Sequence, residues 1–299
     1  MSALTYGWSK KNDPYSFWLH FNSITRSPDS WKEELYATAR AIANRAKKPI
    51  WIASSGGIDS EIACRAFFDQ GIDFSVLTLE HDSGTNRHDI HYAITWCRAH
   101  GVNQKIVRMN VESFFTQEVE SYTERYTAIH PFRYLQIKVL ELIEEMGGFG
   151  VLCSGEQLYQ NDLKQLTLTT TDLHLPLSNG NVIPLEWCKD TNTDHEPYFH
   201  FGTPELCLAY TQIPLVAFAL THPDSIFRHE ANAYTLKRLV YQSVWPDLQV
   251  RYKSHGFEKV GASYEAVKAR LRERFMNNYI PIDLPVTTFQ KQLRGQVSV

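Results

Sequence analysis

The sequence predicts an α/β fold: a parallel sheet with helices on both faces, followed by a mostly helical C-terminal part with a β-hairpin. Short apolar runs alternate with amphipathic segments of helical period through the first half of the 299-residue chain. Beyond residue 160 this alternation stops. We therefore expect an N-terminal helical lead-in over 1–48, an α/β domain over 49–160, and a β-hairpin plus helical region over 161–299.

The elements of the α/β domain follow from the apolar pattern. Four short apolar runs end in glycine or polar turns and are typical of buried parallel strands. The longer segments between them repeat apolar residues at helical spacing, and Gly71 and Gly101 each follow the end of one such segment. The expected strands are 49–54, 74–79, 104–109 and 149–154. The expected helices are 31–45, 59–70, 86–100 and 131–146.

The C-terminal region has different signals. An asparagine-glycine turn at 178–181 lies between Leu166–Leu177 and Val182–Trp187, which predicts a β-hairpin. Thr203 and Pro204 then supply a helix cap and a first helical residue. Two further helices are expected over 232–244 and 263–276.

The bulk composition narrows the class of protein. The 43% apolar fraction supplies a sizeable core, and a formal charge of −3 disfavours a surface built entirely for nucleic acid. From Trp245 onward, however, nine Lys and Arg residues stand against five acidic ones. Five cysteines without C-x-x-C spacing indicate reduced thiols. No stretch has the pattern of a signal peptide or the length of a membrane span, so we expect a soluble cytoplasmic protein.

The loop after the first expected strand carries the chemistry. The string Ser55-Gly56-Gly57-Ile58-Asp59-Ser60 runs directly into a helix, which places backbone N–H groups and two serine hydroxyls around one point. Glycine lets the backbone approach phosphate oxygens closely. The carboxylate of Asp59 among these donors indicates a Mg²⁺ ion that arrives with a nucleotide. Because no G-x-x-x-x-G-K-[ST] string occurs, transfer of a γ-phosphate is disfavoured.

This loop resembles the signature S-G-G-x-D-S of the PP-loop ATP pyrophosphatases, a superfamily with a HUP-like, adenine nucleotide alpha-hydrolase fold. The resemblance implies that Ser55, Gly56, Gly57, Ile58, Asp59 and Ser60 hold the β- and γ-phosphates of ATP. The α-phosphate is then open to attack, and the products are an adenylated substrate and pyrophosphate. Members include asparagine synthetase, β-lactam synthetase, NAD synthetase, GMP synthetase and several tRNA-modifying enzymes.

Two later segments are similar to the asparagine synthetase and β-lactam synthetase branch. Ser154-Gly155-Glu156 matches an S-G-E segment that lies there beside ATP and the amino-acid substrate. Arg251 and Lys253 lie in a basic loop, and that branch places a late lysine on pyrophosphate. The acidic residues that follow S-G-E in that branch are absent, and Asp162 is the next carboxylate that could be a second metal ligand.

The residues and the resemblance together predict an adenylating enzyme. Asp59, Glu156 and Lys253 are the expected catalytic residues, because Glu156 ends the strand that lies across the cleft from Asp59. The adenine is expected against the end of the second strand, near Leu79 and Glu80. The predicted reaction activates a carboxylate or amide oxygen of a small-molecule substrate with ATP and Mg²⁺ for attack by an amine.

The predicted enzyme is thus a ligase that forms a C–N bond. A glutaminase domain is not expected, because the chain begins Met1-Ser2 and lacks the cysteine that would start one. Two alternatives stay open. One is a thiolating or amine-inserting enzyme that acts on a tRNA base, with Cys153 or Cys188 as sulfur carrier, although both are more typical of small buried residues. The other is a module that senses ATP without turnover. The oligomeric state is left open.

A group of polar residues follows the second expected strand. His81, Asp82, His88 and His91 could suggest a metal site, but they surround an expected loop and helix start. Polar surface or substrate contact is the favoured interpretation, and Arg87 beside them is a candidate for contact with phosphate.

Overall fold

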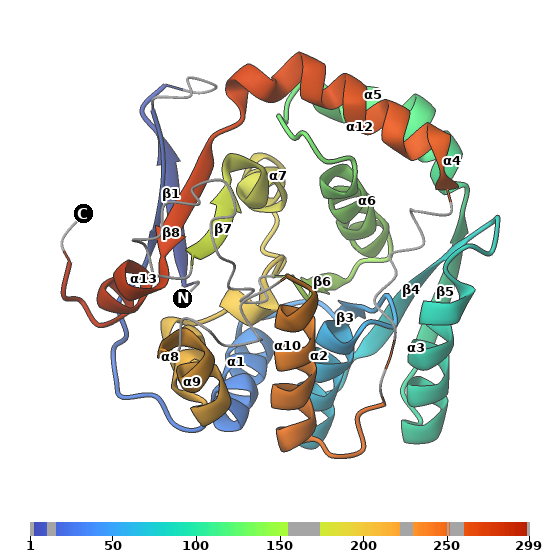
Figure 1. Ribbon diagram of the computed structural model, residues 1–299. Helices are drawn as coiled ribbons and strands as arrows, with labels where there is room; N and C mark the ends of the chain where they lie inside the picture. The colour runs from blue at the N-terminus through green and yellow to red at the C-terminus, as the bar shows by residue number, and fades with distance from the viewer. Residues whose placement is uncertain are drawn as a thin grey trace.

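The core of the protein is a four-stranded parallel sheet in the order β5-β4-β3-β6 (Figure 1). The computed structural model describes residues 3–10, 16–154, 174–221, 230–249, 251 and 260–297. Central β3 comes first along the chain, so loops at its carboxyl end lie where the strand order reverses, the place where such sheets bind ligands. The strands are β3 (Ile50–Ala53), β4 (Ser75–His81), β5 (Gln104–Met109) and β6 (Phe149–Leu152).

Helices cover both faces of this sheet, which confirms the predicted fold class. Helices α1 (Trp31–Arg45), α2 (Ile58–Asp69) and α3 (Arg87–His100) lie on one face, and α6 (Phe132–Glu145) lies on the other (Figure 1). All of these helices agree with the sequence-based ranges to within two residues, because each has a regular apolar stripe.

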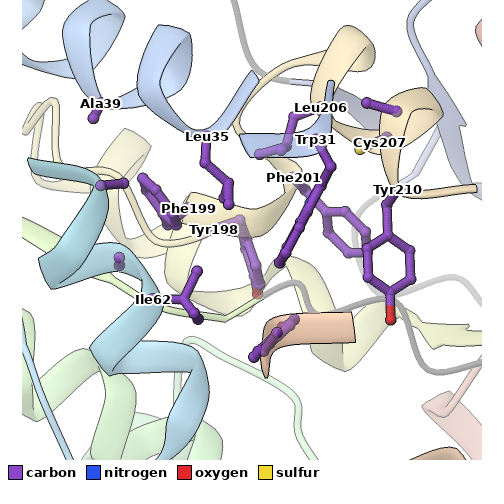
Figure 2. Close-up of a cluster of buried hydrophobic side chains, with 14 of the residues drawn as sticks. Trp31, Leu35, Ala39, Ile62, Tyr198, Phe199, Phe201, Leu206, Cys207 and Tyr210 are labelled. Atoms are coloured by element: carbon purple, nitrogen blue, oxygen red, sulfur yellow. The ribbon is translucent and has the colours of Figure 1, made fainter. Parts of the chain in front are cut away.

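A large aromatic and aliphatic core joins α1 and α2 to the C-terminal region (Figure 2). Leu35 and Ile62 are fully buried against Phe199, which belongs to the short segment 198–201. Trp31 stacks on Tyr241 with ring centroids 5.1 Å apart. Burial of this apolar surface fixes the C-terminal helices against the sheet domain.

The remaining helices occupy the C-terminal region and the crossover between β5 and β6. Thr203 caps α8 as predicted, since its hydroxyl accepts a hydrogen bond from the N–H of Leu206 (3.1 Å). In the described part of the chain no single helix is long and apolar enough to cross a membrane, and only the bent pair α8 and α9 passes that test jointly. These helices are α4 (Val111–Ser113), α5 (Val119–Thr123), α7 (Ile183–Asp190), α8 (Pro204–Gln212), α9 (Pro214–Thr221), α10 (Glu230–Val244), α12 (Ala262–Phe275) and α13 (Val286–Leu293).

The predicted β-hairpin around residues 178–181 is wrong. Strand β7 (His174–Ser178) pairs instead with the distant β8 (Pro281–Pro285), and Val182–Trp187 is helical. Ser178 and Asn181 form a capping box at the asparagine-glycine turn, and Pro184 follows in the first turn of α7. A capping box and an early proline both favour a helix start. Leu166 and the expected boundary at 160 lie outside the described residues.

The N-terminal region contains strands as well as the predicted helix α1. Strands β1 (Leu4–Trp8) and β2 (Phe17–Phe21) form an antiparallel pair. Phe21 is fully buried against Phe289 of α13. Among its described residues, 3–10 and 16–48, the lead-in is therefore helical over α1, and its first part packs on α13 near the end of the chain.

Candidate functional site

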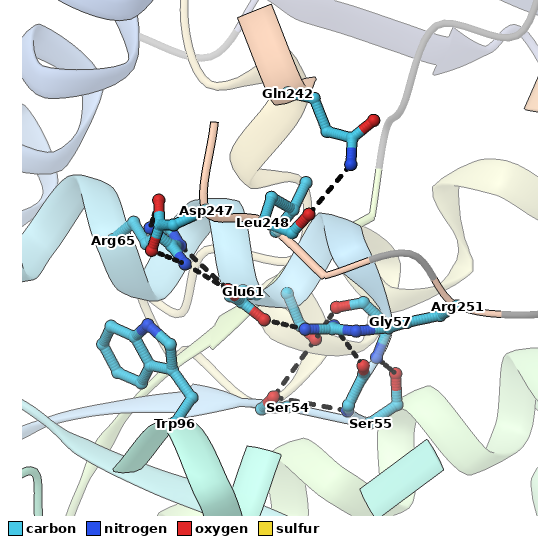
Figure 3. Close-up of polar contacts among 12 residues, drawn as sticks. Ser54, Ser55, Gly57, Glu61, Arg65, Trp96, Gln242, Asp247, Leu248 and Arg251 are labelled. Atoms are coloured by element: carbon cyan, nitrogen blue, oxygen red, sulfur yellow. Dashed lines mark hydrogen bonds and ion pairs between the residues drawn. The ribbon is translucent and has the colours of Figure 1, made fainter. Parts of the chain in front are cut away.

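The Ser55–Ser60 loop joins β3 to α2 at the carboxyl edge of the sheet (Figure 3). Gly56 has a φ of 86°, a conformation that side chains disfavour. A Cβ atom at Gly56 would lie 1.8 Å from the carbonyl oxygen of Asp89, in the first turn of α3. The loop backbone therefore packs directly on α3, and glycine is required there for both reasons.

Serine hydroxyls hold the loop in shape. The Ser54 hydroxyl accepts from the N–H of Gly56 (3.4 Å), and the Ser55 hydroxyl accepts from the N–H of Gly57 (3.3 Å). The Ser60 hydroxyl donates to the carbonyl of Gly57 (2.9 Å). Within the described residues no side chain caps α2, so the N–H groups of its first turn are donors that an anion could use.

Asp59 is bound by two residues of α10. Lys237 Nζ lies 2.8 Å from its Oδ2, and the Tyr241 hydroxyl donates to its Oδ1 (2.8 Å). His200 adds a contact, with Nε2 3.3 Å from the Asp59 carbonyl oxygen. The Lys237 side chain is 4% exposed and the Asp59 side chain 23% exposed. An ammonium group is thus fixed beside the uncapped start of α2.

The charges around Asp59 control its ionisation. Burial alone acts to raise the pKa of this carboxyl group. The ammonium charge of Lys237, an electrostatic contribution from His200 and the hydrogen bonds from Lys237 and Tyr241 outweigh that effect, and the pKa of Asp59 lies below its ordinary value. Asp59 is therefore a carboxylate at neutral pH.

Arg251 braces the loop from its buried side (Figure 3). Its guanidinium group donates to the carbonyl of Gly56 and to the carboxylate of Glu61, and it lies over the ring of Tyr92 at 4.3 Å. Burial lowers the pKa of Arg251 to about 10, which keeps it charged at neutral pH. Arg65 bonds Glu61 from the other side (2.8 Å). The structure thus brings Arg251 to the loop, where it supports the backbone.

Leu79 and Glu80 lie at the end of β4, beside the loop. The Leu79 carbonyl accepts a hydrogen bond from Asn86 Nδ2 (2.8 Å). The Glu80 carboxylate is paired with Arg108 (2.9 Å) and Arg87 (3.1 Å), and hydrogen bonds from these two arginines lower its pKa. Arg87 therefore contacts Glu80, and the adenine contact expected here stays a prediction.

Ser154 follows β6, the neighbour of β3. Pairing of Ala53 with Leu152 places the two strand ends side by side. The Ser154 hydroxyl accepts a hydrogen bond from Gln136 Nε2 of α6 (2.7 Å). The predicted residues Gly155, Glu156, Asp162 and Lys253 lie outside the described residues.

The polar group after β4 does not form a metal site in the described part of the chain, where no three His, Cys, Asp or Glu residues are placed to hold an ion. His81 is buried, with Nδ1 2.8 Å from the Thr85 hydroxyl, and burial lowers its pKa. His88 lies 3.4 Å from Asp89.

The two candidate sulfur carriers have different surroundings. The thiol of Cys153 donates to the carbonyl of Ala53 (3.7 Å), at the strand end next to the loop. Cys188 is buried in α7, and burial raises the pKa of its thiol to about 12. A thiol with this pKa is unreactive at neutral pH, which favours a packing role for Cys188.

Sequence reasoning missed Lys237, Tyr241 and His200. The helix that carries Lys237 and Tyr241 was expected, and their spacing of four places both on one face. No motif marks them, however, and the contact with Asp59 spans about 180 residues. Only the folded chain brings them to the loop.

The sheet order and the loop at the end of the central strand are now both established. The chain has a parallel α/β fold with helices on both faces of the sheet and a glycine turn at the carboxyl end of β3. No family model matches the sequence, and no curated protein matches it either. Among solved structures, it is similar to NMN synthetase from Francisella tularensis (12% identity, TM-score 0.35), covering 83% of this chain and 94% of that one.

Two other solved structures are similar to a comparable degree. The NH3-dependent NAD synthetase from Campylobacter jejuni has 12% identity and a TM-score of 0.34, covering 84% of this chain and 96% of that one. The U34-tRNA thiolase NcsA from Methanococcus maripaludis has 14% identity and a TM-score of 0.32, covering 75% and 83%. Similarities of this size assign neither a reaction nor a branch to the chain.

Proposed function

We propose that the protein binds ATP at the Ser55–Ser60 loop and transfers AMP to an oxygen atom of a second substrate, with release of pyrophosphate. The observation that carries the proposal is the Lys237 ammonium, held 2.8 Å from Asp59 at the uncapped start of α2. Backbone donors and a buried cation at one point suit the developing charge of a departing pyrophosphate.

The loop fits a pyrophosphate group. Gly56 leaves no room for a side chain, and a Cβ at Gly57 would meet only the Ser55 hydroxyl, at 3.3 Å. The exposed hydroxyl of Ser55 adds a donor at the mouth of the loop. Backbone and hydroxyl donors of this kind hold phosphate oxygens without a Walker lysine.

Lys237 is the residue that we assign to charge neutralisation, in the place expected for Lys253. An ammonium group has three donors, so its bond to Asp59 is compatible with a bond to a phosphate oxygen. The pair with Asp59 fixes its position before ATP arrives, which lowers the reorganisation that the reaction requires. Tyr241 holds the other oxygen of Asp59 and so keeps the carboxylate oriented.

Magnesium fits this site through Asp59, whose carboxylate is ionised and lies at the loop. Mg²⁺ would neutralise charge on the phosphates, and it usually takes one or two carboxylates together with phosphate oxygens. Asp59 would supply a carboxylate lone pair that Lys237 and Tyr241 do not use, so both hydrogen bonds would stay in place. Asp162 stays the proposed second carboxylate.

The acceptor oxygen is proposed to belong to a carboxylate or amide that an amine then attacks, which makes the protein a C–N ligase. The second candidate is modification of a tRNA base. Cys153 supports it as the half-buried thiol at the strand end beside the loop. A protein that senses ATP without turnover is the third hypothesis, and the ion pair of Lys237 with Asp59 disfavours it.

Incubation with α- and γ-labelled ATP tests the proposal. AMP and pyrophosphate are the expected products once amino-acid pools or bulk tRNA supply the acceptor. Lys237→Met should lower this turnover by at least about 100-fold, the effect of losing one preorganised charge contact. Lys189→Met, at an exposed site on α7, is the control and should leave it unchanged. Formation of ADP would refute the proposal, and so would an absence of turnover with both the amino-acid pools and the tRNA.

A further inference from the structure

A basic cluster formed by Arg133, Lys268 and Arg272 lies at the start of α6. Arg133 is in the first turn of α6, and the other two residues are on α12, four positions apart and so on one face. That face borders the buried stripe of Val267 and Leu271.

Helix α12 packs on residues 114–118 and shares one hydrophobic cluster with α6. Val267 and Leu271 belong to the same hydrophobic cluster as Ile129 and Leu135, which lie on either side of Arg133 along the chain. In Figure 1, α12 crosses above the end at which the chain enters α6. Arg133, Lys268 and Arg272 all act electrostatically on His130, which precedes α6.

Burial and the positive charges of the cluster both lower the pKa of His130. Its pKa is lowered to about 4, first by burial and then by the charges of Arg272, Arg133 and Lys268, with Glu265 acting in the opposite direction. The imidazole is therefore neutral at physiological pH. It adds a hydrogen-bonding group to the cluster without adding charge.

Carboxylates compensate this cluster only in part. Lys268 pairs with Glu265 at 3.2 Å, whereas within the described residues no carboxylate is ion-paired with Arg133 or Arg272. Glu120 instead pairs with Arg270 and Arg274 on another face of α12. Like charges that face one another are unfavourable unless an anion joins them.

Hydrogen bonds connect the cluster to the proposed ATP site. Arg133 Nη1 donates to Gln136 Oε1 (3.2 Å), and Gln136 Nε2 donates to the Ser154 hydroxyl (2.7 Å). Ser154 follows β6, next to the end of β3 from which the Ser55–Ser60 loop begins. The cluster is thus one strand away from the loop, at the same edge of the sheet.

We infer that the second substrate carries a phosphate group, and that Arg133, Lys268 and Arg272 bind this group while the oxygen to be adenylated lies near Ser154. Arginine forks match phosphate oxygens, and the lysine adds a point charge. The inference rests on the proposed function for the adenylation step, but the phosphate site itself is independent of ATP. The phosphate could belong to a free nucleotide or to an RNA backbone.

Direct binding separates these sources. Uridine 5′-monophosphate, uridine and bulk tRNA are titrated calorimetrically against the wild-type protein without ATP, at low and moderate salt. Preference for the monophosphate over uridine indicates a free nucleotide, and strong binding of tRNA alone indicates an RNA backbone. Arg133→Ala/Arg272→Ala should lower the affinity for the preferred ligand about 100-fold, which is about tenfold for each lost charge contact. For tRNA the salt slope should fall by about 1.5.

Controls separate this site from the loop. Arg98→Ala/Lys47→Ala removes two exposed charges outside the cluster and should not change binding of either probe. Lys237→Met should weaken the binding of ATP and leave the binding of uridine 5′-monophosphate and tRNA unchanged. A failure of the proposed ATP site can therefore be told apart from a failure of the phosphate site. The inference is overturned if neither probe binds, if the double variant binds as the wild type does, or if that variant weakens ATP to the same degree.

Discussion

Removal of the Lys237 ammonium would leave the Asp59 carboxylate without its cation, and the structure sets the expected cost. A fully buried charge that loses its partner destabilises a fold by about 3–5 kcal/mol. Asp59 is 23% exposed and keeps the Tyr241 hydrogen bond, so we expect about 2 kcal/mol for Lys237→Met. With a urea slope of about 3 kcal/mol/M, the unfolding midpoint should fall by about 0.7 M.

The pH dependence gives this prediction its sign. In the wild type the lowered pKa of Asp59 stabilises the fold above the unfolded value of about 3.9, and this contribution is lost as pH falls through the folded pKa. In Lys237→Met, burial is opposed by less positive charge, so the folded pKa rises and protonation relieves the variant. The stability deficit should therefore shrink between pH 7 and about pH 4.

Urea unfolding at both pH values measures this effect, with Asp59→Asn/Lys237→Met as the matched control. The double variant has no unpaired charge and should be more stable than Lys237→Met at pH 7. A deficit of equal size at pH 7 and pH 4, or additive losses in the double variant, would refute the reasoning.

Three other changes test the loop and its surroundings. Gly56→Ala should lower the free energy of unfolding by at least about 3 kcal/mol and abolish ATP binding, because the added Cβ would overlap the Asp89 carbonyl. A variant as stable as the wild type in thermal unfolding would contradict the loop geometry. Arg251→Met should weaken ATP binding by about tenfold, because Glu61 and the Gly56 carbonyl lose the donor that they share. Calorimetry measures this affinity, and an unchanged value would mean that the support from Arg251 is dispensable. Cys188 should resist iodoacetamide at pH 8 in the native state, and rapid labelling seen by mass spectrometry would show that it is accessible.

Local signals made the sheet and its loop predictable. Periodicity, closing glycines and a strand that runs into Ser55–Ser60 are all read within about fifteen residues. The asparagine-glycine turn misled because the capping box of Ser178 and the position of Pro184 favour a helix more strongly than the turn favours a hairpin.

The parts that could not be predicted depend on distant contacts. The pairing of β7 with β8 spans about 100 residues, and the bonds from Lys237 and Tyr241 to Asp59 span about 180. Each of these side chains is ordinary in its own helix. Their roles arise from the packing of α10 against the start of α2, for which the sequence has no local marker.

Two carboxylates, Asp59 and Glu61, lie in the first turn of α2, beside the proposed site for a highly charged anion. Arg65 of the same helix compensates Glu61, whereas Lys237, the cation paired with Asp59, comes from the last third of the chain. During synthesis, the strands and helices of the first half therefore emerge before the cation that pairs with Asp59. The proposed site is thus complete only after α10 has docked on the start of α2, so binding of nucleotide there would report on completed folding.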